Sequence, residues 1–204
     1  MTITAILEYD KRKVLVRVDE HLELPLYKSE ANKYHLEQDM ELSDEVYTEL
    51  IKILSKRVKL RAMNLLQKRS YTREGLRRKL AEGRYPEDLI EEALDYVASY
   101  RYIDDMRYAE EYIRVYCESR SKRRIMQDLY RKGVSSEVAE KAWTCHETMN
   151  APVDEIAQIK ALLQKKGYDA ANTDRKETAR IMNFLYRKGY SVENIKHCVF
   201  FDED

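Results

Sequence analysis

The chain has 204 residues, with 37 Lys and Arg balanced by 37 Asp and Glu, but only 5 glycines and 3 prolines. This scarcity leaves little sequence for tight turns, phosphate loops or sandwich corners, and it predicts a mainly helical protein. The three cysteines are an odd, widely spaced set, which excludes a disulfide framework and a CxxC metal knuckle. There is no long apolar run and no signal-peptide layout, so we expect a cytoplasmic protein.

The net charge of zero is an average over unlike segments. Residues 1–54 carry 7 basic and 12 acidic side chains, whereas residues 55–199 carry 30 basic and 22 acidic ones. Three more acids follow at Asp202, Glu203 and Asp204, so the total divides into −5, +8 and −3. The zero total therefore does not exclude a polyanionic partner.

The first 26 residues predict a small β-hairpin or meander. Apolar side chains recur at a spacing of two from Val14 to Val18 and from Leu22 to Leu26, which is typical of strands. A sheet of this size is marginally stable alone, so we expect it to pack on another element. A polar connection through Met40 is expected to follow.

A long helix is predicted from about residue 44 to residue 68. Ser43 is a good N-cap, and Asp44 and Glu45 place acids in the first turn, where the helix dipole favours them. Apolar side chains then keep a helical spacing as far as Leu66.

The rest of the chain repeats a helical unit. The run LYRKG at residues 129–133 recurs at residues 185–189, and a third copy lies 49 residues before the first of these runs, with Leu76, Leu80, Tyr85, Pro86 and Leu94 in corresponding places. Gly133 and Gly189 are predicted to be left-handed residues at helix ends. Ser135, Ser191 and Pro86 are predicted to begin the following helices.

A further helix precedes each pair, giving three units of three helices. These are the end of the long helix, a helix from Asp105 to about Ser119 capped by Asp104, and one from Val153 to Lys166, opened by Pro152 and closed by Gly167. The predicted fold is mainly α, with tandem three-helix repeats in an elongated, curved array and a small N-terminal β-hairpin or meander. The predicted domains are 1–54, with the strands and the start of the long helix, and repeats at 55–106, 107–150 and 151–204.

No catalytic or cofactor motif is evident, so we expect no enzyme activity, no cofactor and no metal. GxGxxG, GxxxxGK[ST], GxSxG and HExxH are all absent from the sequence. Neighbours on a helix point about 100° apart, so the pairs Cys145-His146 and His197-Cys198 are interpreted as packing residues. Capping explains Asp104-Asp105. Core packing explains most of the aromatic side chains, including Trp143, Tyr108, Tyr112 and Tyr116.

Basic charge is the remaining feature. Residues 56–84 hold eleven Lys and Arg against two acids, and residues 114–132 hold seven against two. The pairs at 131–132 and 187–188 end helices, where cations complement the dipole and need no function. The triple at 122–124 begins a helix, where cations oppose the dipole. Because this placement costs free energy locally, the triple is the better candidate for binding an anionic partner.

Several of these runs resemble the RecX family of recombination regulators. They are AMNLL at 62–66, RSYTREGLRRKL at 69–80, YIDDMRYA at 102–109, RRI at 123–125 and LYRKGV at 129–134. The run at 102–109 is the most specific, and the similarity covers residues 60–143 well and the third repeat by shape. Two departures occur. Gly75 replaces a helix-favouring residue, and Gly83-Arg84-Tyr85 replaces lysine-glycine before an aromatic. The helix must therefore end one residue early or place Arg84 in a strained turn.

The resemblance implies a modulator, usually an inhibitor, of the RecA recombinase in homologous recombination, DNA repair and the SOS response. Such proteins bind RecA and its filament on single-stranded DNA along the helical groove, and they restrain ATP hydrolysis, strand exchange and co-protease activity. We expect a monomer without membrane association, in weak direct contact, if any, with single-stranded or double-stranded DNA. The candidate residues for binding the filament or its DNA are Arg77, Arg78, Lys79, Arg114, Arg120, Lys122, Arg123, Arg124, Arg131 and Lys132.

Two other interpretations stay open. One is a helix-turn-helix nucleic-acid-binding protein that acts without RecA, for which affinity would fall steeply with salt. The other is a helical-repeat scaffold for a different protein, which the segmental charges alone permit.

Overall fold

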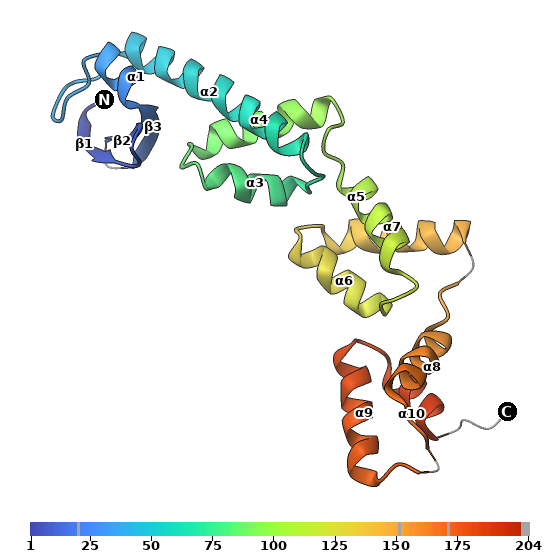
Figure 1. Ribbon diagram of the computed structural model, residues 1–204. Coiled ribbons are helices and arrows are strands. Elements are labelled where there is room, and N and C mark those ends of the chain that lie inside the picture. Colours follow the sequence, from blue (N-terminus) through green and yellow to red (C-terminus); the bar gives the residue numbers. More distant parts are fainter. Residues whose placement is uncertain (20, 151, 171, 201–204) are drawn as a thin grey trace. The chain divides into compact units, whose positions relative to one another are not determined.

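The computed structural model describes residues 1–19, 21–150, 152–170 and 172–200, and the acidic Asp202, Glu203 and Asp204 lie outside this part (Figure 1). Within it the protein is mainly helical, with ten helices and one three-stranded antiparallel sheet, as the low glycine and proline content predicts. The chain forms two compact units, a first unit of residues 1–104 and a second unit of residues 105–204. None of the helices described combines the length and the apolar content that crossing a bilayer requires.

The N-terminal sheet is a meander of β1 (Ile3–Glu8), β2 (Lys13–Val18) and β3 (Leu22–Tyr27). Val16 lies opposite Ile6 on one side and Leu24 on the other. The alternating side chains of β2 and β3 that the sequence singled out join the core of the first unit, and all of them are buried except Leu22, which is partly buried. The sheet therefore packs against helices, as its small size requires.

Helix α1 (Lys28–Lys33) was not predicted, because its segment reads as a polar connection. It has six residues, of which only Ala31 is buried. The Glu30 carboxylate accepts a hydrogen bond from the backbone N–H of Tyr27 at 2.8 Å. A capped helix of fewer than two turns has no periodic apolar face from which it could be recognised.

Helix α2 (Asp44–Leu66) confirms the predicted long helix. The Ser43 side chain accepts a hydrogen bond from the N–H of Val46, as an N-cap does. Buried residues follow at intervals of four from Leu50 to Ala62 and pack into one core with the sheet, α3 (Arg73–Ala81) and α4 (Glu87–Ser99). This core makes the strands and the first helices one unit.

The turn after α3 takes one of the two forms expected from its sequence. Helix α3 ends at Ala81, and Arg84 adopts a left-handed conformation with φ of 55°. Gly133 and Gly189 fill the equivalent place in the other repeats, with φ of 91° and 93°. Arg84 therefore carries a strain that glycine avoids in the other two copies.

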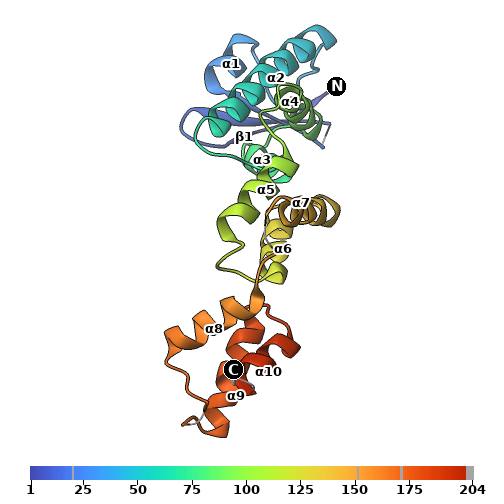
Figure 2. The same ribbon diagram turned by 90° about the vertical axis from the view of Figure 1, so that its right-hand side faces the viewer.

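The second unit contains two helical triplets (Figures 1 and 2). We call α5 (Asp105–Tyr116), α6 (Lys122–Arg131) and α7 (Ser136–Met149) the second triplet, and α8 (Glu155–Lys166), α9 (Arg175–Arg187) and α10 (Val192–Phe200) the third triplet. Each has its own apolar core, with Leu129 and Trp143 in one and Leu185 and Val199 in the other.

Most of the predicted helix boundaries are confirmed, and two are wrong, the first being the end of α5, which lies at Tyr116 and not near Ser119. Ser135 caps α7, Ser191 precedes α10, and Gly167 closes α8 with φ of 65°. Helix α8, however, begins at Glu155 with Asp154 as its cap, and not at Val153 after Pro152. The Asp154 carboxylate accepts the N–H of Ala157, and a side-chain cap of this kind outweighs the preference of proline for a first turn.

Candidate functional site

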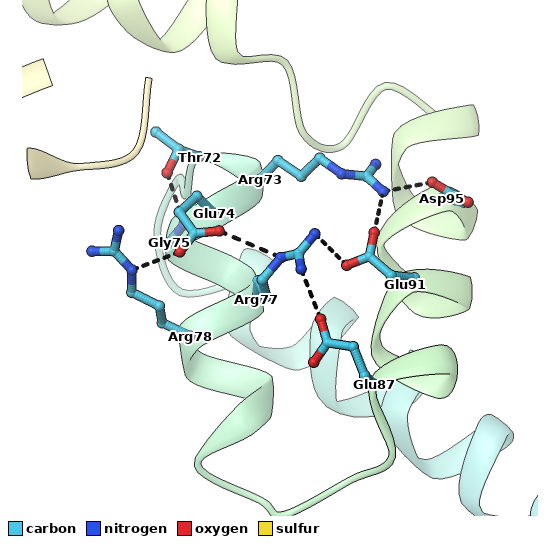
Figure 3. Close-up of polar contacts among 9 residues, drawn as sticks. All are labelled: Thr72, Arg73, Glu74, Gly75, Arg77, Arg78, Glu87, Glu91 and Asp95. Atoms are coloured by element: carbon cyan, nitrogen blue, oxygen red, sulfur yellow. Dashed lines mark hydrogen bonds and ion pairs between the residues drawn. The ribbon is translucent and has the colours of Figure 1, made fainter. Parts of the chain in front are cut away.

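The predicted basic residues of α3 lie in a network of carboxylates (Figure 3). The Arg77 guanidinium lies 2.7 Å from a Glu87 oxygen, 2.5 Å from a Glu91 oxygen and 3.4 Å from a Glu74 oxygen. Arg73 adds contacts of 2.8 Å to Glu91 and 2.7 Å to Asp95. These ion pairs therefore connect α3 to α4, in addition to the apolar contacts between the two helices.

The other two predicted cations of α3 also have carboxylate partners. Arg78 donates to Glu74 at 2.9 Å, and Lys79 donates to Glu82 at 2.6 Å. A sequence signal exists for the pairing of Arg73 and Arg77 with α4, because residues 85–96 contain five acids and no base directly after the basic segment. Counting the basic segment by itself hid the compensation. A role for these three residues in binding a partner stays a prediction.

The basic triple at the start of α6 is compensated less completely. Lys122 lies 3.1 Å from a Glu140 oxygen and 5.4 Å from the Trp143 ring centroid. Arg123 is exposed and lies 5.8 Å from the ring of Tyr186, and no carboxylate in the described part of the chain is within ion-pair distance of it. Arg114 is likewise exposed and forms no ion pair with a described residue.

The N-terminus of α6 meets the C-terminus of α9. The Ser121 hydroxyl accepts a hydrogen bond from the N–H of Arg124 at 3.3 Å and donates one to the carbonyl of Lys188 at 2.8 Å. A Cβ added at Gly189 would lie 2.6 Å from the Ser121 hydroxyl, so only glycine fits this contact. The partial negative charge of the carbonyl groups at the end of α9 thus compensates part of the positive charge of the basic triple. The sequence alone showed no group that could offset the unfavourable placement of these cations at the N-terminus of α6.

Arg120 and Arg124 share one carboxylate. Their guanidinium nitrogens lie 2.9 Å and 3.3 Å from the same oxygen of Asp128, whose side chain is 11% exposed. Arg120 also donates to the Tyr112 hydroxyl at 2.8 Å and stacks on the Tyr116 ring at 3.9 Å. Asp128 was not predicted as part of a site, although the spacing of four residues places Arg124 and Asp128 on one face of α6.

A buried amide connects the two triplets. Gln158 of α8 donates to the carbonyl of Cys117 at 2.5 Å and accepts a hydrogen bond from the Tyr190 hydroxyl at 3.1 Å. Burial of the ring and the nearby charge of Glu155 raise the pKa of Tyr190 to about 12. Nothing in the sequence marked Gln158, because a polar residue becomes structural only when its partners fold onto it.

The remaining candidates lie apart from this contact. Arg131 and Lys132 are exposed at the end of α6, and the ammonium of Lys132 lies 5.4 Å from the Tyr112 ring. Cys145 and His146 line an open cavity between α5 and α7. In the described part of the chain, no three His, Cys, Asp or Glu side chains gather as a metal site would require.

Three family models of RecX match the chain, the first three-helix domain at residues 59–96, the second at 104–142 and the third at 154–199. A regulatory protein RecX from Vibrio parahaemolyticus is 34% identical over 146 residues, covering 70% of this chain and 90% of that protein. The protein of the same name from Vibrio vulnificus is 32% identical over 139 residues, covering 68% and 88%.

Solved structures support the fold. A crystal structure of regulatory protein RecX matches with a TM-score of 0.64 and 22% identity, covering 99% of each chain. A crystal structure of RecX from Lactobacillus salivarius matches with a TM-score of 0.60 and 23% identity, covering 72% of this chain and 96% of that one. The family models and the identity to the Vibrio proteins agree with the motifs of the sequence, and the chain therefore belongs to the RecX family of regulatory proteins.

Proposed function

We propose that this protein binds RecA and the RecA filament on single-stranded DNA, and inhibits ATP hydrolysis, strand exchange and co-protease activity. Membership of a family of regulatory proteins supports a regulatory role. The tandem triplets, each with its own core, support binding along an extended partner. The cationic surface of α6 is the observation that carries the proposal.

The α6 surface consists of Arg120, Lys122, Arg123, Arg124, Arg131 and Lys132, whereas the predicted Arg114 lies on α5 and lines cavities with residues of α7 and α8. It includes one exposed arginine, Arg123, that forms no ion pair with a described carboxylate. Tyr130 on the same helix is 71% exposed. Arg123 lies 5.8 Å from the ring of Tyr186, which is 50% exposed, and an unpaired arginine beside an exposed aromatic ring is typical of surfaces that bind an acidic partner. Charge of one sign also raises the rate of encounter with such a partner.

Helix α3 fits this role less well. Arg77 already pairs with Glu87 and Glu91, so binding a partner through it would leave Glu87 without its cation and Glu91 with Arg73 alone. Arg78 and Lys79 each have a simpler ion pair within or next to the helix, which is weak and easily exchanged. We therefore propose that α6 makes the main contact and that Arg78 and Lys79 contribute at most secondary ones.

The DNA-dependent ATPase activity of RecA, measured with substoichiometric and equimolar protein, tests the proposal. We expect inhibition that grows with the ratio, and weaker inhibition by the double variant Lys122→Glu, Arg123→Glu. The matched control is Lys52→Glu, Lys56→Glu, which reverses two exposed lysines of α2. A flat response to the wild-type protein would contradict the proposal. Salt-steep, sequence-selective duplex binding without RecA would favour the helix-turn-helix alternative instead.

A further inference from the structure

A cleft opens where the second and third triplets meet. It has a volume of about 320 Å³, and we call it the junction cleft. Its lining residues come from the turn before α6, from the first turn of α6 and from the end of α9, and they are Ser119, Arg120, Arg124, Arg187, Lys188 and Tyr190. Four of these six side chains are cationic and none is acidic.

The junction cleft contains more positive charge than the neighbouring negative groups neutralise. Asp128 is the carboxylate shared by Arg120 and Arg124, so it balances one of the four charges. Arg187 and Lys188 are exposed and form no ion pair with any residue that the structure describes. The carbonyl end of α9 supplies a further partial negative charge, equivalent to roughly half an elementary charge. About two and a half positive charges therefore remain for a ligand.

The walls of the cleft are held in place before any ligand binds. Arg120 is fixed by Tyr112, Asp128 and the ring of Tyr116. Tyr190 is buried and fixed through Gln158. Because the Ser121 hydroxyl bonds the Lys188 carbonyl, the two ends that carry the cations keep their spacing. A site organised in this way loses little conformational freedom on binding.

We propose that the junction cleft binds a phosphate group. Guanidinium groups match the tetrahedral oxygens of phosphate in pairs, and three of the four cations here are arginines. The same chemistry is presented by a free pyrophosphate and by the phosphodiester of a single strand, and the test below separates the two sources. Binding at this cleft does not require RecA, so it stands independently of the function proposed above.

The test uses the double variant Arg187→Glu, Lys188→Glu in the full chain. Its matched control is Lys165→Glu, Lys166→Glu, because that pair also ends a helix of the third triplet, is exposed and changes the net charge equally. The probes are inorganic pyrophosphate, followed by calorimetry, and a labelled short oligothymidylate, followed by fluorescence anisotropy. The midpoint of thermal unfolding verifies that both variants fold.

We expect saturable binding of at least one probe, and the cleft variant should weaken it by about tenfold or more, equivalent to about 1.4 kcal/mol. The control should change it by less than about twofold, and the salt dependence of oligothymidylate binding should fall by a slope of about 1 in the cleft variant alone. Binding of pyrophosphate that competes with the strand assigns a free phosphate ligand as well, and binding of the strand alone assigns a phosphodiester. Equal losses in both variants, or no saturable binding of either probe, would overturn the proposal.

Discussion

Helices α3 and α6 are equivalent in the repeat, and both are rich in cations, but their charges are compensated in different ways. In α3 every predicted cation has a carboxylate partner, and Arg77 bridges to α4 through two of them. In α6 the compensation comes from one shared Asp128, from Glu140 and from the carbonyl end of α9, and Arg123 has no described carboxylate beside it. The same repeat thus supports a closed ion-pair network in one copy and an open basic surface in another.

This difference shows why a count of basic residues is a weak guide to a binding surface. The segment of residues 56–84 has the larger excess of basic residues in the sequence, yet acids of α4 pair with Arg73 and Arg77 of α3 in space (Figure 3). Charge that is neutralised within the fold contributes stability, whereas charge left exposed is available to a partner. The following variants test this separation, from the largest expected effect to the smallest.

Substitution of Gly189 should have the largest effect, because it disrupts the contact between the N-terminus of α6 and the end of α9. Gly189→Ala places a Cβ 2.6 Å from the Ser121 hydroxyl at a φ of 93°, so it combines backbone strain with loss of the cap. We expect the free energy of unfolding of the second unit to fall by about 2–4 kcal/mol. Denaturant unfolding followed by fluorescence of Trp143 measures this.

The control for that variant is Gly167→Ala. Gly167 also has a positive φ, of 65°, but nothing lies within 4 Å of the added Cβ. This variant should therefore show only the backbone strain, a loss of about 1 kcal/mol. Equal losses at the two positions would show that the contact between α9 and Ser121 contributes nothing.

Loss of Arg77 should break the closed network of α3. Arg77→Met keeps much of the side-chain volume but leaves Glu87 without a cation and Glu91 with Arg73 alone. Because the Arg77 side chain is 35% exposed, solvent screens part of the effect, and we expect a loss of about 1–2 kcal/mol in the first unit. Chemical denaturation followed by circular dichroism measures the loss. Arg78→Met, which removes an exposed i,i+4 pair, should cost less than about 0.5 kcal/mol.

The contact between the triplets should weaken at high pH through Tyr190. Its pKa is raised to about 12 in the folded protein, against about 10 in the unfolded chain. Between these values the folded state binds more protons than the unfolded state, so the stability is complete below about pH 10 and falls as the pH rises toward 12.

Tyr190→Phe tests this pH dependence. The variant should lose about 1 kcal/mol at neutral pH, where the hydroxyl donates to Gln158, and it should show a shallower fall in stability above pH 10. Tyrosines elsewhere titrate equally in both proteins, so the difference between their unfolding midpoints isolates Tyr190. Parallel curves for the two proteins up to pH 12 would contradict the assignment.

The smallest effect is expected at Arg84, the position where α3 departs from the glycine of the other repeats. Arg84→Gly should relieve the left-handed strain but lose the ion pair to Glu23 at 3.1 Å, for a net gain of about 0.5 kcal/mol. Arg84→Ala loses the ion pair and keeps the strain, so its thermal midpoint should lie below that of the wild type. A midpoint for Arg84→Gly below that of Arg84→Ala would contradict this account.

The sequence predicted the helices better than the surfaces. Apolar spacing and caps placed α2 and the repeats correctly, since those features act within a few residues of each other. Gln158 and the contact of Ser121 with Lys188 join segments 41 and 67 residues apart, so no local pattern reveals them. The acids of α4 could have been noticed, because they follow the basic segment directly.

The most direct test of the central claim compares Arg77→Met with Arg123→Glu in two assays, denaturant unfolding and inhibition of the DNA-dependent ATPase activity of RecA. We predict that Arg77→Met lowers the free energy of unfolding by about 1–2 kcal/mol and leaves inhibition by the folded protein unchanged. Arg123→Glu should weaken inhibition and leave stability within about 0.5 kcal/mol of the wild type. Loss of inhibition in Arg77→Met under conditions where it is folded, with full inhibition by Arg123→Glu, would contradict the separation of roles between α3 and α6.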